Sequence, residues 1–407
     1  MPAVRHQLPG SLLSTHHIGF LFNHDHVHQV AHSAPIAFEL SRQYPQWCIT
    51  LIFGSDEERS ALEVIGARFP GQRCEWARLG MRASWRRLNS ALDHLAPIRK
   101  IAGLRENIDL LRQFDALVVP EKTSLQLRSR YGLKHLQMIH TRHGAGDRAI
   151  GFDARSGDFD LVLVAGEKIR QRLAAAGELR EGHYAVVGYS KFDAVGAFDP
   201  QPRKLFDNDR PTVLYNPHRA PGLTSWFRMG RDILEFFYRS DRYNLVFAPH
   251  VMLFRRRLQI DFDPPNLAWV ADVDRKYRNC SHMLIDTGSV ACTDMTYTLG
   301  ADIYLGDVSS QVCEFLLRPR PCLFANAQHV AWAGDVNYTA WTLGPVFEEV
   351  GALESTLERA IASHPQYRAL QEEYVRQTFD LSAVPSSQRA AAAIAEFLER
   401  GSVTVAR

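Results

Sequence analysis

Residues Ala301 to Phe324, ADIYLGDVSSQVCEFLLRPRPCLF, predict a strand, a turn with two serines and a helix in immediate succession. The apolar strand over 303–305 ends at Gly-Asp, and Ser309 and Ser310 then offer hydroxyl groups that can cap the following helix. Backbone N–H groups and partial positive charge at such a helix start favour phosphate. The stretch therefore predicts either a diphosphate site or an ordinary capped strand–helix unit.

Glu314 lies one helical turn beyond Ser310, on the same face of the predicted helix. A carboxylate at this position can accept hydrogen bonds from the hydroxyl groups of a ribose. The turn and the carboxylate together are what a nucleotide site needs.

Strand-like and helix-like segments alternate along most of the chain, which is typical of parallel sheets covered by helices. The expected strands are 17–22, 47–53, 116–120, 137–140, 161–165, 184–187, 212–215, 245–248, 267–270, 283–286, 303–305 and 322–324. Helices are expected at 34–42 and at 389–400. This pattern predicts an α/β fold.

A polar stretch with prolines, 196–210, interrupts the alternation and is the expected linker. It divides a doubly wound, Rossmann-like N-terminal domain over 1–195 from a second one over 211–380, and the two are expected to face a cleft. A helix within 381–407 is expected to cross back to the first domain. A length of 407 residues fits two domains.

Composition narrows the class of protein. Hydrophobic residues make up 46% and charged residues 23% of the chain, as in globular proteins, and the net charge of +2 gives no support for nucleic-acid binding. The six cysteines include no C-x-x-C pair, which favours a reducing compartment. The first residues lack the apolar core of a signal peptide, and no window is apolar enough to span a membrane. We therefore expect a cytoplasmic protein.

Five segments, in order, resemble the motifs of the CDP-glycerol glycerophosphotransferases of teichoic-acid and capsule synthesis. The family motifs H-G-x-x-x-K, T-G-Y-P-R-x-D, Y-A-P-T-W-R, H-P and D-Y-S-S with a following K-P-I-I-F-like strand resemble 143–148, 187–193, 215–219, 248–250, and 307–310 with 320–324. The likeness covers about half of the chain. Arg148 takes the place of the motif lysine, proline precedes His250 instead of following it, and no tryptophan stands near Arg219. Glu314 stands where the family often has aspartate.

The resemblance implies the GT-B fold, with the acceptor on the N-terminal domain and the nucleotide donor on the C-terminal domain. It implies a transferase that moves a glycerophosphate or related polyol-phosphate unit from a CDP-activated donor to a hydroxyl of a cell-surface glycopolymer or its lipid-linked precursor. His143 is then the base on the acceptor hydroxyl, and His250 binds the donor phosphate. The implied donor-binding residues are Arg148, Arg219, Asp307, Ser309, Ser310 and Glu314.

No D-x-D-like metal motif stands out in the expected donor domain, so we expect no obligatory metal ion or other cofactor. Two other functions stay open, because a diphosphate site does not distinguish glycerol from a sugar. One is a GT-B glycosyltransferase that uses a nucleoside-diphosphate sugar. The other is a non-catalytic GT-B-like protein that binds a nucleotide or a partner.

The stretch 23–28, NHDHVH, and His32 after it concentrate histidines behind the first expected strand. They fit a metal site, a polar turn, or a loop on the acceptor side of the cleft that presents His26 and His28. Two basic segments, 81–105 and 254–257, combine arginines with apolar residues. Each fits either a solvated face or peripheral contact with an anionic membrane.

Overall fold

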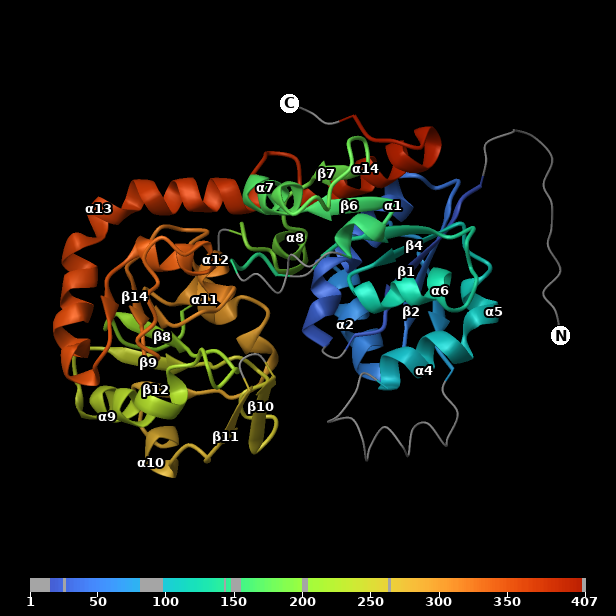
Figure 1. Ribbon diagram of the computed structural model, residues 1–407. Coiled ribbons are helices and arrows are strands. Elements are labelled where there is room, and N and C mark those ends of the chain that lie inside the picture. The colour runs from blue at the N-terminus through green and yellow to red at the C-terminus, as the bar shows by residue number, and fades with distance from the viewer. Residues whose placement is uncertain are drawn as a thin grey trace.

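The computed structural model describes residues 15–24, 27–80, 98–142, 144–147, 155–199, 204–262 and 265–404. Within these residues, the strands form two parallel sheets and one separate two-stranded hairpin (Figure 1). The sheet of the N-terminal half has seven strands in the order β3-β2-β1-β4-β5-β6-β7, and that of the C-terminal half has six in the order β12-β9-β8-β13-β14-β15. The α/β class with two doubly wound sheets, predicted from the alternation, is confirmed.

Most strands of the first sheet are nearly continuous apolar runs, because helices cover both faces of the sheet; the edge strand β3 is the exception. Its strands are β1 (His17–Phe22), β2 (Cys48–Phe53), β3 (Glu75–Arg78), β4 (Ala116–Val119), β5 (Gln137–His140), β6 (Leu161–Val164) and β7 (Tyr184–Val186). The helices are η1 (Val27–His32), α1 (Ala34–Gln43), α2 (Asp56–Gly66), α4 (Ile98–Glu106), α5 (Ile108–Leu111), η2 (Lys122–Leu125), α6 (Gln126–Ser129), η4 (Ser156–Asp158), α7 (Glu167–Ala175) and α8 (Lys191–Val195).

The second sheet repeats this plan with shorter helices between its strands. Its strands are β8 (Thr212–Asn216), β9 (Asn244–Phe247), β12 (Met283–Ile285), β13 (Ile303–Gly306), β14 (Cys322–Ala325) and β15 (Val346–Phe347). Its helices are η5 (Trp226–Gly230), α9 (Arg231–Arg239), α10 (Arg275–Arg278), η6 (Val290–Cys292), α11 (Thr296–Gly300), α12 (Gln311–Phe315), η7 (Val336–Leu343) and η8 (Val350–Ala352).

Each sheet reverses its strand order once. In the second sheet the chain starts at β8, builds β9 and β12 on one side, and then returns to build β13, β14 and β15 on the other. The loops after β8 and β13 therefore diverge at the carboxyl edge, where open α/β sheets bind ligands. The same reversal lies between β1 and β4 in the first sheet.

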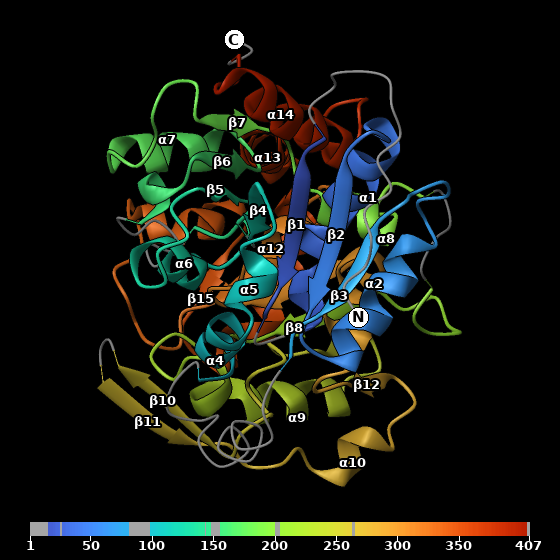
Figure 2. The same ribbon diagram turned by 90° about the vertical axis from the view of Figure 1, so that its right-hand side faces the viewer.

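A long helix joins the two halves. α13 (Leu353–Phe379) starts against the second sheet and ends against Tyr189 and Phe192 of the first half. Pro365 lies inside it and cannot donate a helical hydrogen bond, and Figure 1 shows the helix bending as it crosses. α14 (Ser386–Arg400) then packs on α1, as Figure 2 also shows. We propose that the end of α13 and α14 belong to the N-terminal half; the linker over 196–210 stays a prediction.

The expectation that 267–270 belongs to the main parallel series is wrong. This segment lies in β11 (Pro265–Trp269), which pairs antiparallel with β10 (Leu258–Phe262) in the separate hairpin. An apolar run indicates a strand but not its partner, so the sequence did not reveal the hairpin. No helix in the described part of the chain is both long enough and apolar enough to cross a membrane.

Candidate functional site

The carboxyl edges of the two sheets meet where the loop after β5 lies against the turn after β13. The Cys313 thiol donates to the Ala145 carbonyl oxygen at 3.5 Å. A Cβ on Gly146 would come within 3.1 Å of the Ser310 Cβ, so 144–147 packs directly on the serine turn. Two segments that sequence reasoning assigned to the acceptor and donor sides are therefore neighbours. His143 and Arg148 themselves lie outside the described residues.

The backbone on both sides of position 143 is left-handed. Arg142 has φ 47° and Gly144 has φ 76°. An arginine rarely adopts this conformation, which costs about 1 kcal/mol or more and is typical of functional turns. The local geometry thus fits a turn held for function.

Asp147, at the end of the same loop, is buried and joins three parts of the chain. One carboxylate oxygen pairs with the Lys168 Nζ of α7 at 2.7 Å. The other accepts from the Tyr374 hydroxyl of α13 at 2.9 Å and from the Ala340 backbone N–H at 3.1 Å. Burial raises the pKa of Tyr374 well above its usual value, so this hydroxyl keeps its proton as a donor. The network fixes the loop relative to both halves.

Asp307, at the carboxyl end of β13, is buried and organises the loop after β8. Its carboxylate accepts from the His218 backbone N–H at 2.8 Å, and from the Ser225 N–H and Oγ at 2.7 and 3.0 Å. Burial raises its pKa to about 6, against these hydrogen bonds, which lower it. Asp307 thus acts on the site by positioning the loop that carries His218 and Arg219; direct donor binding by this carboxylate stays a prediction.

Two histidines stand side by side at the ends of β8 and β9. The His218 and His250 rings are 5.6 Å apart at an interplanar angle of 63°. The Nδ1 atoms accept the backbone N–H groups of Ala220 at 3.1 Å and Met252 at 3.2 Å, respectively. In the neutral rings the proton must therefore be on Nε2, which makes both of these atoms donors. Sequence reasoning selected His250 and the half-buried Arg219 but missed His218, although it directly follows the Asn-Pro that ends β8.

Of the two serines expected to cap the helix, only Ser309 forms a side-chain hydrogen bond to the backbone at its start. Ser309 Oγ accepts the Gln311 N–H at 3.3 Å, whereas the exposed Ser310 makes no side-chain cap hydrogen bond. α12 has only five residues, so its dipole is small. What the turn offers is hydroxyl and N–H groups beside the 144–147 loop. Phosphate binding by Ser309 and Ser310 stays a prediction.

Glu314 connects the two halves. Its side chain is only 8% exposed and forms an ion pair with Lys191 of α8 at 2.6 Å. The Tyr189 hydroxyl donates to the same oxygen at 3.1 Å, and burial raises the pKa of Tyr189 well above its usual value. The carboxylate thus has partners from the protein itself, and a hydrogen bond to a ribose stays a prediction. Tyr189 and Lys191 belong to the motif-like segment 187–193, but nothing in the sequence indicated that they contact Glu314.

In the histidine stretch after β1, it is His32, rather than His28, that lies beside the contact between Tyr189 and Glu314. The His32 ring lies edge-on to the Tyr189 ring at 5.2 Å, and the Ser190 hydroxyl donates to the His32 carbonyl oxygen. His28 is half-buried in η1, and His26 lies outside the described residues. Among the residues that the structure describes, no three His, Cys, Asp or Glu side chains are grouped to hold a metal ion. The acceptor role of His26 and His28 stays a prediction.

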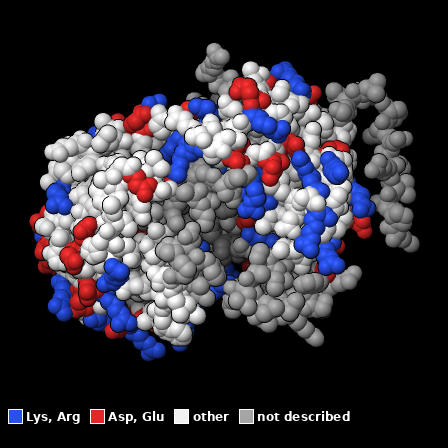
Figure 3. Space-filling model, viewed as in Figure 1, with Lys and Arg blue, Asp and Glu red and all other residues white. Residues whose placement is uncertain are grey.

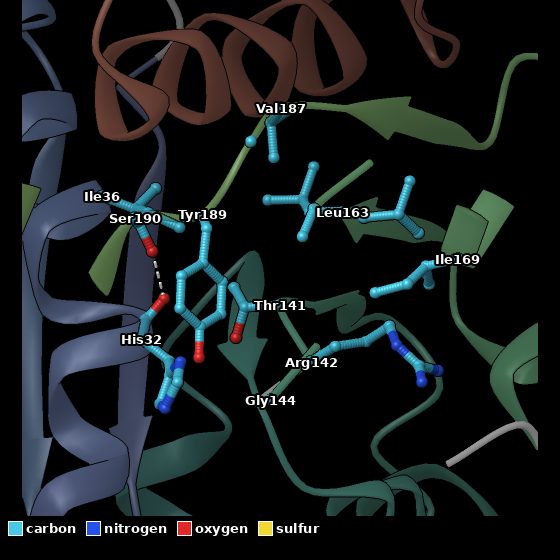
Figure 4. A pocket seen from close by; sticks show the side chains of 13 residues that line it. His32, Ile36, Thr141, Arg142, Gly144, Leu163, Ile169, Val187, Tyr189 and Ser190 are labelled. Atoms are coloured by element: carbon cyan, nitrogen blue, oxygen red, sulfur yellow. Dashed lines mark hydrogen bonds between the residues drawn. The ribbon is translucent and has the colours of Figure 1, made fainter. Parts of the chain in front are cut away.

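A narrow pocket opens between this stretch, the loop after β5 and the loop after β7 (Figure 4). Figure 4 shows His32, Tyr189 and Thr141 turned toward one another, with Arg142 and Gly144 below them. The pocket belongs to the N-terminal half and adjoins the turn at position 143.

The basic segment 81–105 is only partly described, because 81–97 lie outside the described residues. Lys100 is buried and forms an ion pair with Glu121 at 3.0 Å. Lys100 therefore adds no charge to a basic surface of this segment, and the two interpretations of 81–105 stay predictions. A buried lysine in an otherwise polar segment cannot be distinguished from a solvated one without knowing its partner.

Comparison with known proteins gives structural likeness only. No family model matches the chain, and no curated protein does. A structure of the wall teichoic acid polymerase TagF soaked with CDPG has a TM-score of 0.60 at 14% identity, over 95% of this chain and 89% of that one. A second TagF structure has a TM-score of 0.59 at 15% identity, over 94% and 89%.

A UDP-GlcNAc 2-epimerase from Neisseria meningitidis, bound to UDP-GlcNAc, has a TM-score of 0.54 at 12% identity, over 94% of this chain and 99% of that one. These neighbours share the arrangement of two Rossmann-like halves seen here. The protein therefore has the GT-B fold, which confirms at the level of the fold its resemblance to the CDP-glycerol glycerophosphotransferases.

Proposed function

We propose that the protein is a transferase that moves a glycerophosphate or related polyol-phosphate unit from a CDP-activated donor to a hydroxyl group. The acceptor in this proposal is a cell-surface glycopolymer, such as a teichoic acid or capsule chain, or its lipid-linked precursor. The motif resemblance and the TagF-like fold both support this reading. A cytoplasmic donor and a lipid-linked acceptor would meet at the inner face of the membrane, where we place the enzyme.

The observation that carries the proposal is the pair His218 and His250 at the switch point of the second sheet. With Nδ1 of each ring engaged by the backbone, the proton of the neutral imidazole is on Nε2, which is the atom that we propose donates to the phosphate oxygens. Arg219 lies in the same loop and adds positive charge. This donor set suits a diphosphate whose charge grows as it reacts.

In the proposed reaction the acceptor oxygen attacks the β-phosphorus of the donor. A new phosphorus–oxygen bond forms, the bond to the CMP oxygen breaks, and CMP leaves with that electron pair. His143 takes the acceptor proton, while His218, His250 and nearby arginines stabilise the charge on the phosphate oxygens. We further propose that no metal ion or other cofactor is required, so turnover should persist in a chelator; strict metal dependence would contradict this part.

The test is calorimetric titration of the full chain with CDP-glycerol, CMP, CDP, UDP and UDP-GlcNAc in one buffer. We expect cytidine-selective binding, and CMP as the released nucleotide once an acceptor is supplied. His218→Ala should weaken binding of CDP-glycerol by about tenfold or more, because one phosphate donor is lost. His135→Ala, at an exposed histidine of the other half, is the matched control.

The UDP-GlcNAc 2-epimerase fold supports a second candidate, a GT-B enzyme that acts on a nucleoside-diphosphate sugar. Such an enzyme would bind UDP-GlcNAc in preference to CDP-glycerol; a glycosyltransferase would also release UDP when an acceptor is supplied, whereas an epimerase would leave the sugar attached to UDP. A non-catalytic GT-B-like protein would bind no nucleotide, or would bind one and release no product when an acceptor is supplied. The titration and the product assay together therefore separate all three functions.

A groove on the N-terminal half offers a path for an anionic acceptor. It is lined by Lys122, Thr123, Leu125, Gln126, Arg128, Ser129, Lys134, Arg155 and Asp158. Figure 3 shows Lys and Arg side chains gathered on this half, over α5 and α6. The side of the groove formed by 155–158 is in contact with the turn at position 143, because Arg142 donates a hydrogen bond to the Ser156 hydroxyl at 3.5 Å. We propose that phosphate groups of the acceptor bind in this groove.

The exposed Lys134 provides the test of the groove. Lys134→Glu should raise the KM for a polyanionic acceptor severalfold and leave the affinity for the donor unchanged. Lys204→Glu, at an exposed lysine of the predicted linker, should change neither constant. Equal acceptor KM values for the two variants would rule out the groove.

A further inference from the structure

The β10–β11 hairpin exposes its apolar face and buries a polar side chain on the opposite face. Leu258 lies directly opposite Trp269, and Leu267 lies two residues from Trp269 on the same strand. Side chains two residues apart, and directly opposite pairs, share one face of a ribbon. Leu258, Leu267 and Trp269 therefore form one apolar face, which we call the hairpin face.

The hairpin face points to solvent. Its three side chains are 39%, 63% and 64% exposed, respectively. The opposite face turns inward, because Gln259 is buried and donates to the Met252 and Leu253 carbonyl oxygens, each at 2.9 Å. Figures 1 and 2 show the hairpin at one corner of the C-terminal half, apart from the six-stranded sheet. An amphipathic ribbon that exposes its apolar side needs something to cover it.

Positive charge borders this face. Arg255, Arg256 and Arg257 immediately precede β10, and Arg255 and Arg257 are exposed. Arg257 lies 3.7 Å from the carboxylate of Asp272, which is itself exposed. An arginine run beside a tryptophan and leucines matches an anionic bilayer, whose head groups attract the arginines while Trp and Leu enter the interface.

We propose that the hairpin face, with Arg255–Arg257, docks the protein on an anionic lipid surface. Three exposed apolar side chains on one face of a ribbon, bordered by arginines, fit a lipid interface better than a folded partner, for which a shaped pocket would be expected. The proposal does not depend on which nucleotide the site binds.

The anchoring of Gln259 gives this surface a mechanical role. Gln259 holds the hairpin to the turn over 251–254, whose backbone also sets the His250 ring through Met252. A hairpin seated on lipid therefore keeps His250 at a fixed height above the bilayer. A lipid-linked acceptor would then always meet the site in one orientation.

The test is co-sedimentation of the full chain with vesicles of phosphatidylcholine, with and without phosphatidylglycerol. We expect binding only when phosphatidylglycerol is present, and weaker binding in high salt. The double variant Leu267→Ser, Trp269→Ser and the double variant Arg255→Glu, Arg257→Glu should each lose about tenfold or more in vesicle affinity. If a double variant has a lowered Tm, Trp269→Ala alone replaces it.

The matched control is Val290→Ser with Val336→Ser, which removes exposed apolar side chains outside the hairpin. It should bind vesicles like the unmodified protein. Equal binding to both lipid mixtures, or full binding by the hairpin variants, would overturn the proposal. It would also be overturned if light scattering showed a dimer that the hairpin variants convert to a monomer, since the face would then pair two copies of the chain.

Discussion

At the scale of single residues, two backbone hydrogen bonds decide what the paired histidines can do. By accepting an N–H at Nδ1, His218 and His250 have the proton of the neutral ring on Nε2, so that Nε2–H is a donor. A histidine in this state is a hydrogen-bond donor to phosphate and a poor base. This tautomer explains why we propose His218 and His250 as hydrogen-bond donors and His143 as the base.

Replacing His250 tests this role. His250→Ala should lower kcat by about 10²–10³, the usual cost of one donor to a developing charge, while the donor still binds. The measurement is steady-state turnover with CMP release as the readout. His135→Ala should turn over normally, and near-normal turnover of His250→Ala would show that the pair serves only to shape the loop.

Asp307 should make stability depend on pH. Its folded pKa of about 6 lies above the ordinary value of 3.8, so the folded state favours the protonated form. Its contribution to the free energy of unfolding is therefore full below about pH 4 and is lost as the pH rises to about 6. The stability difference between the unmodified protein and Asp307→Asn should shrink over this interval by up to about 3 kcal/mol. Denaturant unfolding at several pH values measures it, and a constant difference would refute the assignment.

At the scale of elements, the contact of α8 with α12 joins the halves through one buried ion pair. Glu314→Ala would leave the Lys191 ammonium buried without its carboxylate, which typically costs about 3–5 kcal/mol. Lys191→Met with Glu314→Leu should recover most of that loss, because no charge stays buried.

Thermal and denaturant unfolding would measure both Glu314 variants. The exposed Arg59–Glu63 pair of α2 supplies the control, where Glu63→Ala should cost about 0.5 kcal/mol or less. A loss as small for Glu314→Ala would mean that the halves do not depend on the pair.

Elements with buried apolar runs were predictable, and contacts between distant elements were not. β1 and β13 were predicted because each is an apolar segment. β3, Glu-Trp-Ala-Arg, was not predicted, because it is a largely exposed edge strand with no apolar run. Lys191 and Glu314 are separated by 123 positions, and nothing in either local pattern records that they meet. His218 was overlooked because its value lies in its place at the switch point, which only the strand order reveals.

At the scale of the whole molecule, α13 holds the halves together by close packing on α7. Gly166, just before α7, lies so near the end of α13 that a Cβ would come within 2.5 Å of the Thr378 backbone. Gly166→Ala should therefore push the helix away and cost about 1–3 kcal/mol.

The Gly166 prediction is checked by Tm and by limited proteolysis in the turn at 381–385. Gly351→Ala is the control, because its Cβ would meet nothing within 4 Å and the change should stay within about 0.5 kcal/mol. Identical cleavage rates for the two variants would show that α13 does not need this contact.

The crossing helix also limits how the two halves can move. Besides the predicted linker at 196–210, the chain passes between the halves along α13. Two halves connected at two points can rotate relative to each other only about the axis through both connections. For the proposed transferase, any opening wide enough for the nucleotide product to leave must then widen the acceptor side by the same rotation, so both products would be released in a single step.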